Sequence, residues 1–167
     1  YGARVNQAGL VLDPDGIAIS TAVYERWYPD LTSDGTNYLV VWQDGRNGSS
    51  YDIYGARVNQ TGVVLDPNGI CICRNRFPLP LVFDPRFSVA FASDVFCVVW
   101  EDGRSTEWEN SNIYACRVAR DGTVLDTAGI LITYSAYIQC QSCCVFDGQN
   151  YLVGWMDARN PPFPYYA

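Results

Sequence analysis

One block of sequence occurs three times in this chain. It reads YGARVNQAGLVLDPDGIAIS from Tyr1, YGARVNQTGVVLDPNGICIC from Tyr54 and YACRVARDGTVLDTAGILIT from Tyr114. A second block follows each copy, as DGTNYLVVWQDGR from Asp34, SDVFCVVWEDGR from Ser93 and DGQNYLVGWMDAR from Asp147. Because such repeats form similar structural units that stack on their neighbours, we expect one domain over 1–167 built from units 1–53, 54–113 and 114–167.

Each unit carries the sequence signals of strands and turns. The run from Tyr38 to Trp42 is rich in β-branched and aromatic residues and is followed by the turn-forming Asp44-Gly45. No window of the chain keeps the i, i+3, i+4 apolar spacing of a helix over three turns. The sequence therefore predicts an all-β fold of three repeats, each made of four short antiparallel strands.

The strands that contain YLVVW, FCVVW and YLVGW are apolar at both odd and even positions, which indicates that both of their faces are covered. In a β-propeller each four-stranded sheet lies between two neighbouring sheets, so β-propeller-type blades fit this pattern. The alternative is a β-trefoil, a threefold barrel whose strands alternate more strictly and whose units tend to be shorter.

The pattern DGxNYLVVWxDxR, followed by DIYGARVNxxGxVLDPxGIxIS, resembles tandem repeats of large secreted and surface proteins of bacteria and archaea. The resemblance covers nearly the whole chain. It implies propeller-like blades and an extracellular or cell-surface location, and it implies no particular activity. Unit 114–167 departs from the pattern at Thr127-Ala128 and Ala158, and unit 54–113 lacks the DGxN turn.

Two residue types are missing from the chain, and their absence excludes several functions. The chain has no histidine, and its 11 basic residues are all arginine. Catalytic triads with histidine, imidazole metal ligands, lysine Schiff bases and P-loop lysines are therefore excluded. The net charge of −7 disfavours nucleic-acid binding. No stretch approaches the roughly 20 consecutive apolar residues of a membrane span.

We expect no catalytic residues, so the predicted protein is not an enzyme. The enzyme alternative is a glycoside hydrolase, which needs only two suitably spaced carboxylates. Glu107 and Glu109 are the only candidates for such a pair, and a solvated charged loop explains them more simply.

The WxDGR corner recurs in each unit and is the candidate ligand-binding site. In a carbohydrate-binding lectin, the aromatic ring would stack on a sugar while the charged groups bind its hydroxyls. The favoured interpretation is structural: Asp accepts N–H groups of the turn, Arg pairs with Asp, and Trp fills the space between blades. The corner residues are Trp42, Asp44, Arg46, Trp100, Asp102, Arg104, Trp155, Asp157 and Arg159.

Two turns resemble calcium loops because oxygen-bearing side chains precede a glycine. They read Asp13-Pro14-Asp15-Gly16 and Asp66-Pro67-Asn68-Gly69, and both are also ordinary turn sequences. The third copy, at 126–129, has lost the second oxygen ligand. We therefore expect turns and no cofactor, with calcium as the alternative.

Seven cysteines are many for a cytosolic domain of this size and favour disulfides in an extracellular protein. Cys97 and Cys116 take apolar positions on consecutive strands, where either a cross-strand disulfide or two buried thiols fit. A thiolate metal site is the third interpretation, and the spacing disfavours it. An odd count leaves one thiol free or bonded to another chain. The disulfide candidates are Cys71, Cys73, Cys97, Cys116, Cys140, Cys143 and Cys144.

These observations predict a non-catalytic extracellular or cell-surface module for binding or structural assembly. The chain begins at an expected third blade strand and ends after a second one, so its ends could complete one blade together. Apolar end faces favour association. We expect contact with further copies or further blades through 1–20 and 134–159, with Cys140, Cys143 or Cys144 as candidates for a covalent link. Glycans are the alternative partner.

Overall fold

The computed structural model describes residues 1–48, 50–78, 87–103 and 111–160. These residues form β-strands and no helix, which confirms the all-β prediction. None of the described residues belongs to a helix with the length and apolarity that crossing a membrane requires. The strands are β1 (Arg26–Ser33), β2 (Asn37–Asp44), β3 (Ser50–Asn59), β4 (Ile70–Pro78), β5 (Ser88–Ala92), β6 (Val95–Asp102), β7 (Asn112–Ala119), β8 (Ile130–Thr133), β9 (Gln139–Phe146) and β10 (Tyr151–Asp157).

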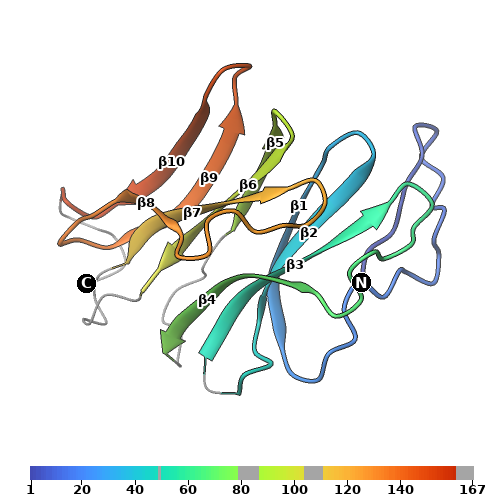
Figure 1. Ribbon diagram of the computed structural model, residues 1–167, viewed down its shortest axis with the longest axis horizontal. Coiled ribbons are helices and arrows are strands. Elements are labelled where there is room, and N and C mark those ends of the chain that lie inside the picture. Colours follow the sequence, from blue (N-terminus) through green and yellow to red (C-terminus); the bar gives the residue numbers. More distant parts are fainter. Residues whose placement is uncertain (49, 79–86, 104–110, 161–167) are drawn as a thin grey trace.

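The strands form three antiparallel sheets in chain order. The first sheet is β1-β2-β3-β4, the second is β5-β6-β7-β8, and the third is the two-stranded β9–β10 hairpin. Figure 1 shows them side by side, with the N-terminal segment (residues 1–20) at one end and the β9–β10 hairpin at the other. The molecule therefore has four layers that follow one another in chain order.

The prediction of four strands in each unit is wrong for unit 1–53. Its first half makes only isolated bridges, between Gly2 and Ile17 and between Val5 and Val11. The equivalent residues of the second unit belong to β3, which pairs along its length with β2. In the described part of the chain, no strand lies beside residues 1–5 in the place that β2 takes beside β3, and a strand needs such a hydrogen-bonded neighbour.

Apolar side chains fill the spaces between the layers. Leu39 and Val41 of β2 point to the second sheet, whereas Val40 and Trp42 of the same strand point to the N-terminal segment. Both faces of β2 are therefore buried, as its continuous apolar run predicted. The space between the first and second sheets holds the largest cluster, made of Leu39, Val41, Ile53, Ile72, Cys73, Phe87, Val89, Phe96, Val98, Trp100, Cys116 and Val118.

The β9–β10 hairpin covers the far face of the second sheet. Cys97 and Val99 of β6 pack there with Ile113 and Ala115 of β7. Tyr151, Val153 and Trp155 cover this cluster from β10. The other face of the hairpin has no layer over it within the described residues, and its apolar side chains Val145 and Leu152 are exposed.

Candidate functional site

The WxDGR corner of the first sheet is a closed set of hydrogen bonds at the end of β2. The indole N–H of Trp42 donates to Asp44 Oδ2 at 2.8 Å. Arg46 donates from Nε to Asp44 Oδ1 and from a terminal nitrogen to Oδ2, each at 2.8 Å. The second terminal nitrogen of Arg46 donates to the carbonyl of Asn68, and its guanidinium lies over the ring of Tyr54 at 3.8 Å. These contacts occupy both charged groups of the corner.

Asp44 is buried and ionised. Burial opposes the charged form of this carboxyl, but the hydrogen bonds from Arg46 and Trp42 outweigh burial and lower its pKa below the ordinary value. A carboxylate that is held by two side chains in this way stabilises the turn after β2. It has little free surface to offer a ligand.

The other two corners repeat the central contact. Trp100 Nε1 donates to Asp102 Oδ2 at 3.0 Å. In the third corner the guanidinium of Arg159 binds Asp157, and hydrogen bonds from Arg159, Gln139 and Trp155 lower the pKa of that carboxyl despite its partial burial. Arg104 lies outside the described residues, as do Glu107 and Glu109, the candidate acids of a glycoside hydrolase.

The three corner tryptophans lie at equivalent positions near the ends of β2, β6 and β10. Trp42 and Trp100 are buried between layers, and Trp155 is half-buried against the second sheet. An aromatic ring that stacks on a sugar needs an open face, and neither Trp42 nor Trp100 has one. In the described part of the three corners, each Trp therefore lies beside its Asp, and the carboxylates are bound inside the fold.

A second recurring pair, which the sequence interpretation missed, is an Arg–Asp clamp in each unit. Arg57 donates to both carboxylate oxygens of Asp66 at 2.8 and 2.9 Å, and the backbone N–H of Arg57 donates to the same side chain. Because this geometry is bidentate and charge-assisted, it ties the start of the turn to β3. The three clamps are Arg4–Asp13, Arg57–Asp66 and Arg117–Asp126.

Two of the clamps also connect consecutive units. The remaining terminal nitrogen of Arg4 donates to the carbonyl of Gln60 at 2.7 Å, and that of Arg57 donates to the carbonyl of Arg120 at 3.1 Å. Each guanidinium therefore closes its own turn and holds the turn of the next unit. The signal was present in the sequence, since an Arg precedes an Asp by nine residues in all three copies.

The clamps account for Asp13 and Asp66, the first residues of the two calcium-like turns. The hydrogen bonds from Arg4 lower the pKa of Asp13 to about 2, and Asp66 is likewise held below its ordinary pKa, although burial opposes this. The backbone N–H of Gly16 donates to the carbonyl of Asp13, which closes an ordinary tight turn. Within the described residues, no group of three or more acidic or thiol side chains is placed to hold a metal ion.

The seven cysteines all carry free thiols in this structure. Cys97 lies opposite Arg117 in the β6–β7 ladder and Cys116 lies opposite Val98, so their side chains point to opposite faces of the second sheet. The cross-strand disulfide considered for this pair is therefore incompatible with the register. Burial raises the pKa of Cys97 and of Cys116 to about 12, as expected of inert buried thiols.

The other cysteines are divided between the layers. Cys71 is half-buried and Cys73 buried on β4. On β9, Cys140 is buried and Cys143 exposed, and the thiol of Cys144 lies 3.7 Å from the carbonyl oxygen of Cys97. Disulfides among these residues remain a prediction.

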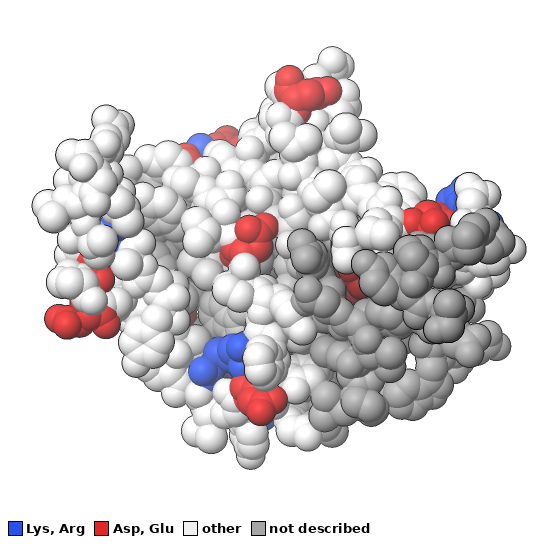
Figure 2. Space-filling view, turned by 180° about the vertical axis from the view of Figure 1, so that it is seen from behind, with Lys and Arg blue, Asp and Glu red and all other residues white. Residues whose placement is uncertain are grey.

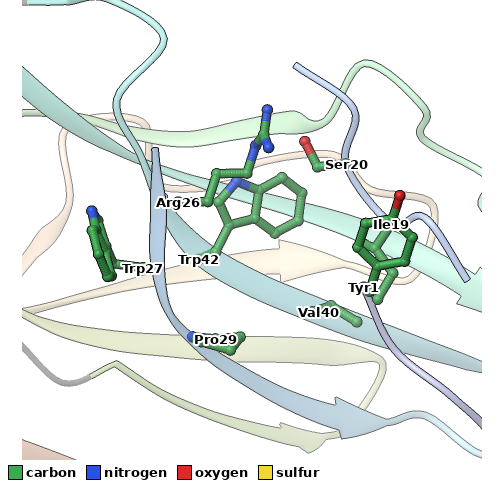
Figure 3. Close-up of a pocket in the computed structure, with 8 residues that line it drawn as sticks. All are labelled: Tyr1, Ile19, Ser20, Arg26, Trp27, Pro29, Val40 and Trp42. Carbon is green, nitrogen blue, oxygen red and sulfur yellow. The ribbon is translucent and has the colours of Figure 1, made fainter. Parts of the chain in front are cut away.

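An open groove lies between the N-terminal segment and the first sheet, beside the Trp42 corner. It consists of two adjoining hollows of about 290 and 280 Å³, which share Ile19 and Val40 in their walls. Figure 3 shows Trp27, Arg26 and Tyr1 around the first hollow, with Trp42 behind Arg26. Trp27 and Tyr1 are exposed, so this N-terminal groove is where the corner region meets the solvent.

The face of the molecule opposite to the view of Figure 1 carries few charged side chains. Figure 2 shows acidic and basic side chains there as separate small groups on a mostly uncharged surface. No extended charged patch covers the described residues on that side. The N-terminal groove is likewise lined mainly by apolar and aromatic residues, with Arg26 in the first hollow and Arg4 in the second as its charged side chains. An apolar or aromatic ligand would fit the walls of the N-terminal groove better than a charged one.

Comparison with known proteins bears on the fold. No family model matches the chain, and a search among curated proteins finds no match. The chain is similar to the crystal structure of alpha-L-arabinofuranosidase from Lactobacillus brevis, with a TM-score of 0.54 and 12% sequence identity. The match covers 82% of this chain and 47% of the enzyme's chain, so the chain spans about half the length of that structure. At this identity the likeness concerns the fold alone.

Proposed function

We propose that this chain is a non-catalytic β-propeller-type repeat module, outside the cytoplasm or on the cell surface, that serves in binding or structural assembly. The face-to-face stacking of separate sheets supports blades over a β-trefoil barrel. The repeat pattern, which resembles that of large secreted and surface proteins, supports the location.

The observation that carries the proposal is the internal use of the recurring polar residues. Asp44 is bound by Trp42 and Arg46, and Asp66 is bound by Arg57. Both sets return in other units, because each sheet has to solve the same packing problem. A catalytic or ligand-binding carboxylate would need free oxygen atoms facing solvent, whereas Asp44 and Asp66 both have partners inside the fold.

Substitution of a corner aspartate tests whether the corner is structural. Asp44→Ala leaves the indole N–H of Trp42 and the guanidinium of Arg46 without their acceptor, so we expect a loss of about 1–3 kcal/mol in the free energy of unfolding. Asp15→Ala, at an exposed turn position, is the matched control and should leave the melting temperature unchanged. We also expect no binding of the wild-type chain on a glycan array.

The opposite result on the same two measurements would replace the proposal. Glycan binding that Asp44→Ala abolishes at an unchanged melting temperature would make the corner a lectin site. Hydrolysis of aryl glycosides, aryl α-L-arabinofuranosides among them, would make the chain a carboxylate-based glycoside hydrolase. Either assay uses the 167-residue chain directly.

Carbohydrate binding in the N-terminal groove is the second candidate function. Its support is the pair of exposed aromatic side chains, Tyr1 and Trp27, beside the Arg26 guanidinium. Such a site would stack a sugar on an indole and donate hydrogen bonds from the arginine. In that case Trp27→Ala removes glycan binding at an unchanged melting temperature, because the side chain is half-exposed.

A further inference from the structure

We propose that the β9–β10 hairpin of a second copy of this chain fills the N-terminal groove of the first copy and forms one four-stranded sheet with residues 1–5 and 17–20 of the first copy. The inference deepens the proposed assembly function, on which it rests, by naming the partner and the register. Four observations support it. Two concern uncovered faces of sheets, one concerns unpaired strand edges, and one concerns hydrogen bonds from a backbone N–H to a side chain of the neighbouring sheet.

The first observation is the outer face of β10. Leu39, Cys97 and Leu152 are equivalent residues of β2, β6 and β10, and their exposed fractions are 0%, 6% and 69%. Leu39 is covered by the second sheet and Cys97 by the β9–β10 hairpin. Leu152 has the same place, and within the described residues no further layer covers it, so the hairpin's outer face has the side chains that a covering sheet would contact.

The second observation is the inner wall of the N-terminal groove. Leu31 pairs with Val40 in the first sheet as Val89 pairs with Val98 in the second, so the two residues are equivalent. Val89 is 7% exposed because the first sheet covers it, whereas Leu31 is 57% exposed. Among the residues that the structure describes, no preceding sheet covers Leu31, which lines the N-terminal groove.

The third observation is a pair of complementary strand edges. Residues 1–5 correspond to 54–58 of β3, and β3 pairs with β2 through Trp42↔Tyr54, Val40↔Ala56 and Tyr38↔Val58. Within the described residues, β10 is hydrogen-bonded to β9 alone and residues 1–5 have no strand on their corresponding edge. The repeat register then places Trp155 opposite Tyr1, Val153 opposite Ala3 and Tyr151 opposite Val5 of the other copy.

The fourth observation is a backbone contact that passes from sheet to sheet. Asp30 accepts the N–H of Val89 at 2.8 Å, and Ser88 accepts the N–H of Cys144 at 3.0 Å. Cys143 is the third member of this series, because it pairs with Gly154 as Asp30 pairs with Val41 and Ser88 with Val99. Its exposed thiol is directed to the place where Leu31 of the other copy would lie.

The contact is heterologous, since one end of the chain meets the opposite end of its partner. The described residues of each copy supply two four-stranded sheets, the β9–β10 hairpin and the N-terminal segment that would pair with a hairpin. If both ends of both copies engage, two chains share six sheets, within the four to eight of closed propellers. Closure by two copies therefore leaves no apolar end face uncovered.

The mass of the particle and two face-specific variants test the inference. Static light scattering of the wild-type chain at micromolar concentration should give twice the 18.7 kDa of one chain. Leu152→Arg on the hairpin and Leu31→Arg in the N-terminal groove should each halve that mass, because each buries a charge in the contact. Both side chains are exposed in the single chain, so neither variant should alter its circular dichroism.

Leu125→Arg is the matched control. The equivalent leucines Leu12, Leu65 and Leu125 are 45%, 39% and 45% exposed, so this position faces solvent in each unit, whatever its neighbours. Leu125→Arg should therefore keep the dimer mass. The register is tested by Ala3→Cys combined with Val153→Cys, which should give a disulfide between chains that peptide mapping locates at positions 3 and 153.

A wild-type monomer, or a dimer that Leu152→Arg and Leu31→Arg both leave intact, would overturn the inference. A folded monomer that binds no glycan would overturn the dimer but not the proposed function. The neighbours of the module would then be further sheets of a longer chain. A monomer that binds glycans through Trp27 makes a sugar the occupant of the N-terminal groove. Hydrolysis, or glycan binding at the Asp44 corner, instead overturns the proposed function, whatever the mass.

Discussion

The contact between the first and second sheets and the outer face of the β9–β10 hairpin are made by equivalent residues of one repeat. In the inner contact, Leu39 and Gln43 of β2 are completely buried, and their equivalents on β10 are Leu152 and Met156. On the hairpin, Leu152 and Met156 are exposed, although β10 pairs with β9 much as β2 pairs with β1. Whether these side chains are buried therefore depends on whether another layer covers their face of the sheet. The apolar residues of the repeat are placed for contacts between neighbouring sheets.

Most of the hydrophobic stabilisation should accordingly come from the inner contact, since burial contributes about 25 cal/mol per Å² of apolar surface. The hairpin depends on one face only. It is expected to be the layer that opens first when the stack is destabilised, because it has two strands and one covered face.

Truncating equivalent tryptophans should have the largest effect and tests this difference directly. Trp100→Ala removes a fully buried ring between the first and second sheets and should cost about 3–5 kcal/mol. Trp155→Ala, on the half-buried equivalent, should cost clearly less. Urea unfolding followed by circular dichroism measures both. Equal losses would mean that the hairpin contact is as complete as the inner one.

The Arg–Asp clamps should give the next largest difference. Arg57→Met removes the bonds to Asp66 and to the carbonyl of Arg120, and we expect a loss of about 1–3 kcal/mol. Arg117→Met removes a more exposed clamp within its own unit and should destabilise less. Methionine keeps most of the side-chain volume in both variants. Thermal unfolding ranks them, and a larger loss for Arg117→Met would contradict the role of the clamp between units.

The smallest effect is expected in acid and concerns the clamp at the N-terminal end. Asp13 has a folded pKa of about 2 against an ordinary 3.8, so its stabilising effect is complete above pH 3.8 and is lost as the pH falls through 2. The melting temperature should decline over this window. An NMR titration of Asp13 measures the pKa, with Arg4→Gln as the variant that returns it toward 3.8. A wild-type value near 3.8 would show that the end clamp is open in solution.

The repeat alone predicted the all-β fold and the strands β2 and β6, which carry Trp42 and Trp100 and are buried on both faces. The same prediction is wrong for β10, whose apolar run YLVGW has one uncovered face because no further layer lies over it within the described residues. It did not reveal the Arg–Asp clamps, since the aspartates of turns 13–16 and 66–69 were considered without the arginine nine residues earlier. Cys97 and Cys116 lie on opposite faces of the second sheet because the β6–β7 register is offset by one residue from the one that would pair them. The spacing of residues along the chain does not specify this register. Residues 1–20 depend on a neighbouring strand that local sequence cannot supply.

The clamps also bear on how the number of sheets changes during evolution. Arg57 carries the donor for the carbonyl of Arg120, and the following unit carries that acceptor together with an arginine of its own. A duplicated unit therefore arrives with both sides of the contact already matched, and inserting it requires no compensating substitution in its neighbours. Such a lineage can lengthen or shorten by whole units, because each unit contacts only its neighbours.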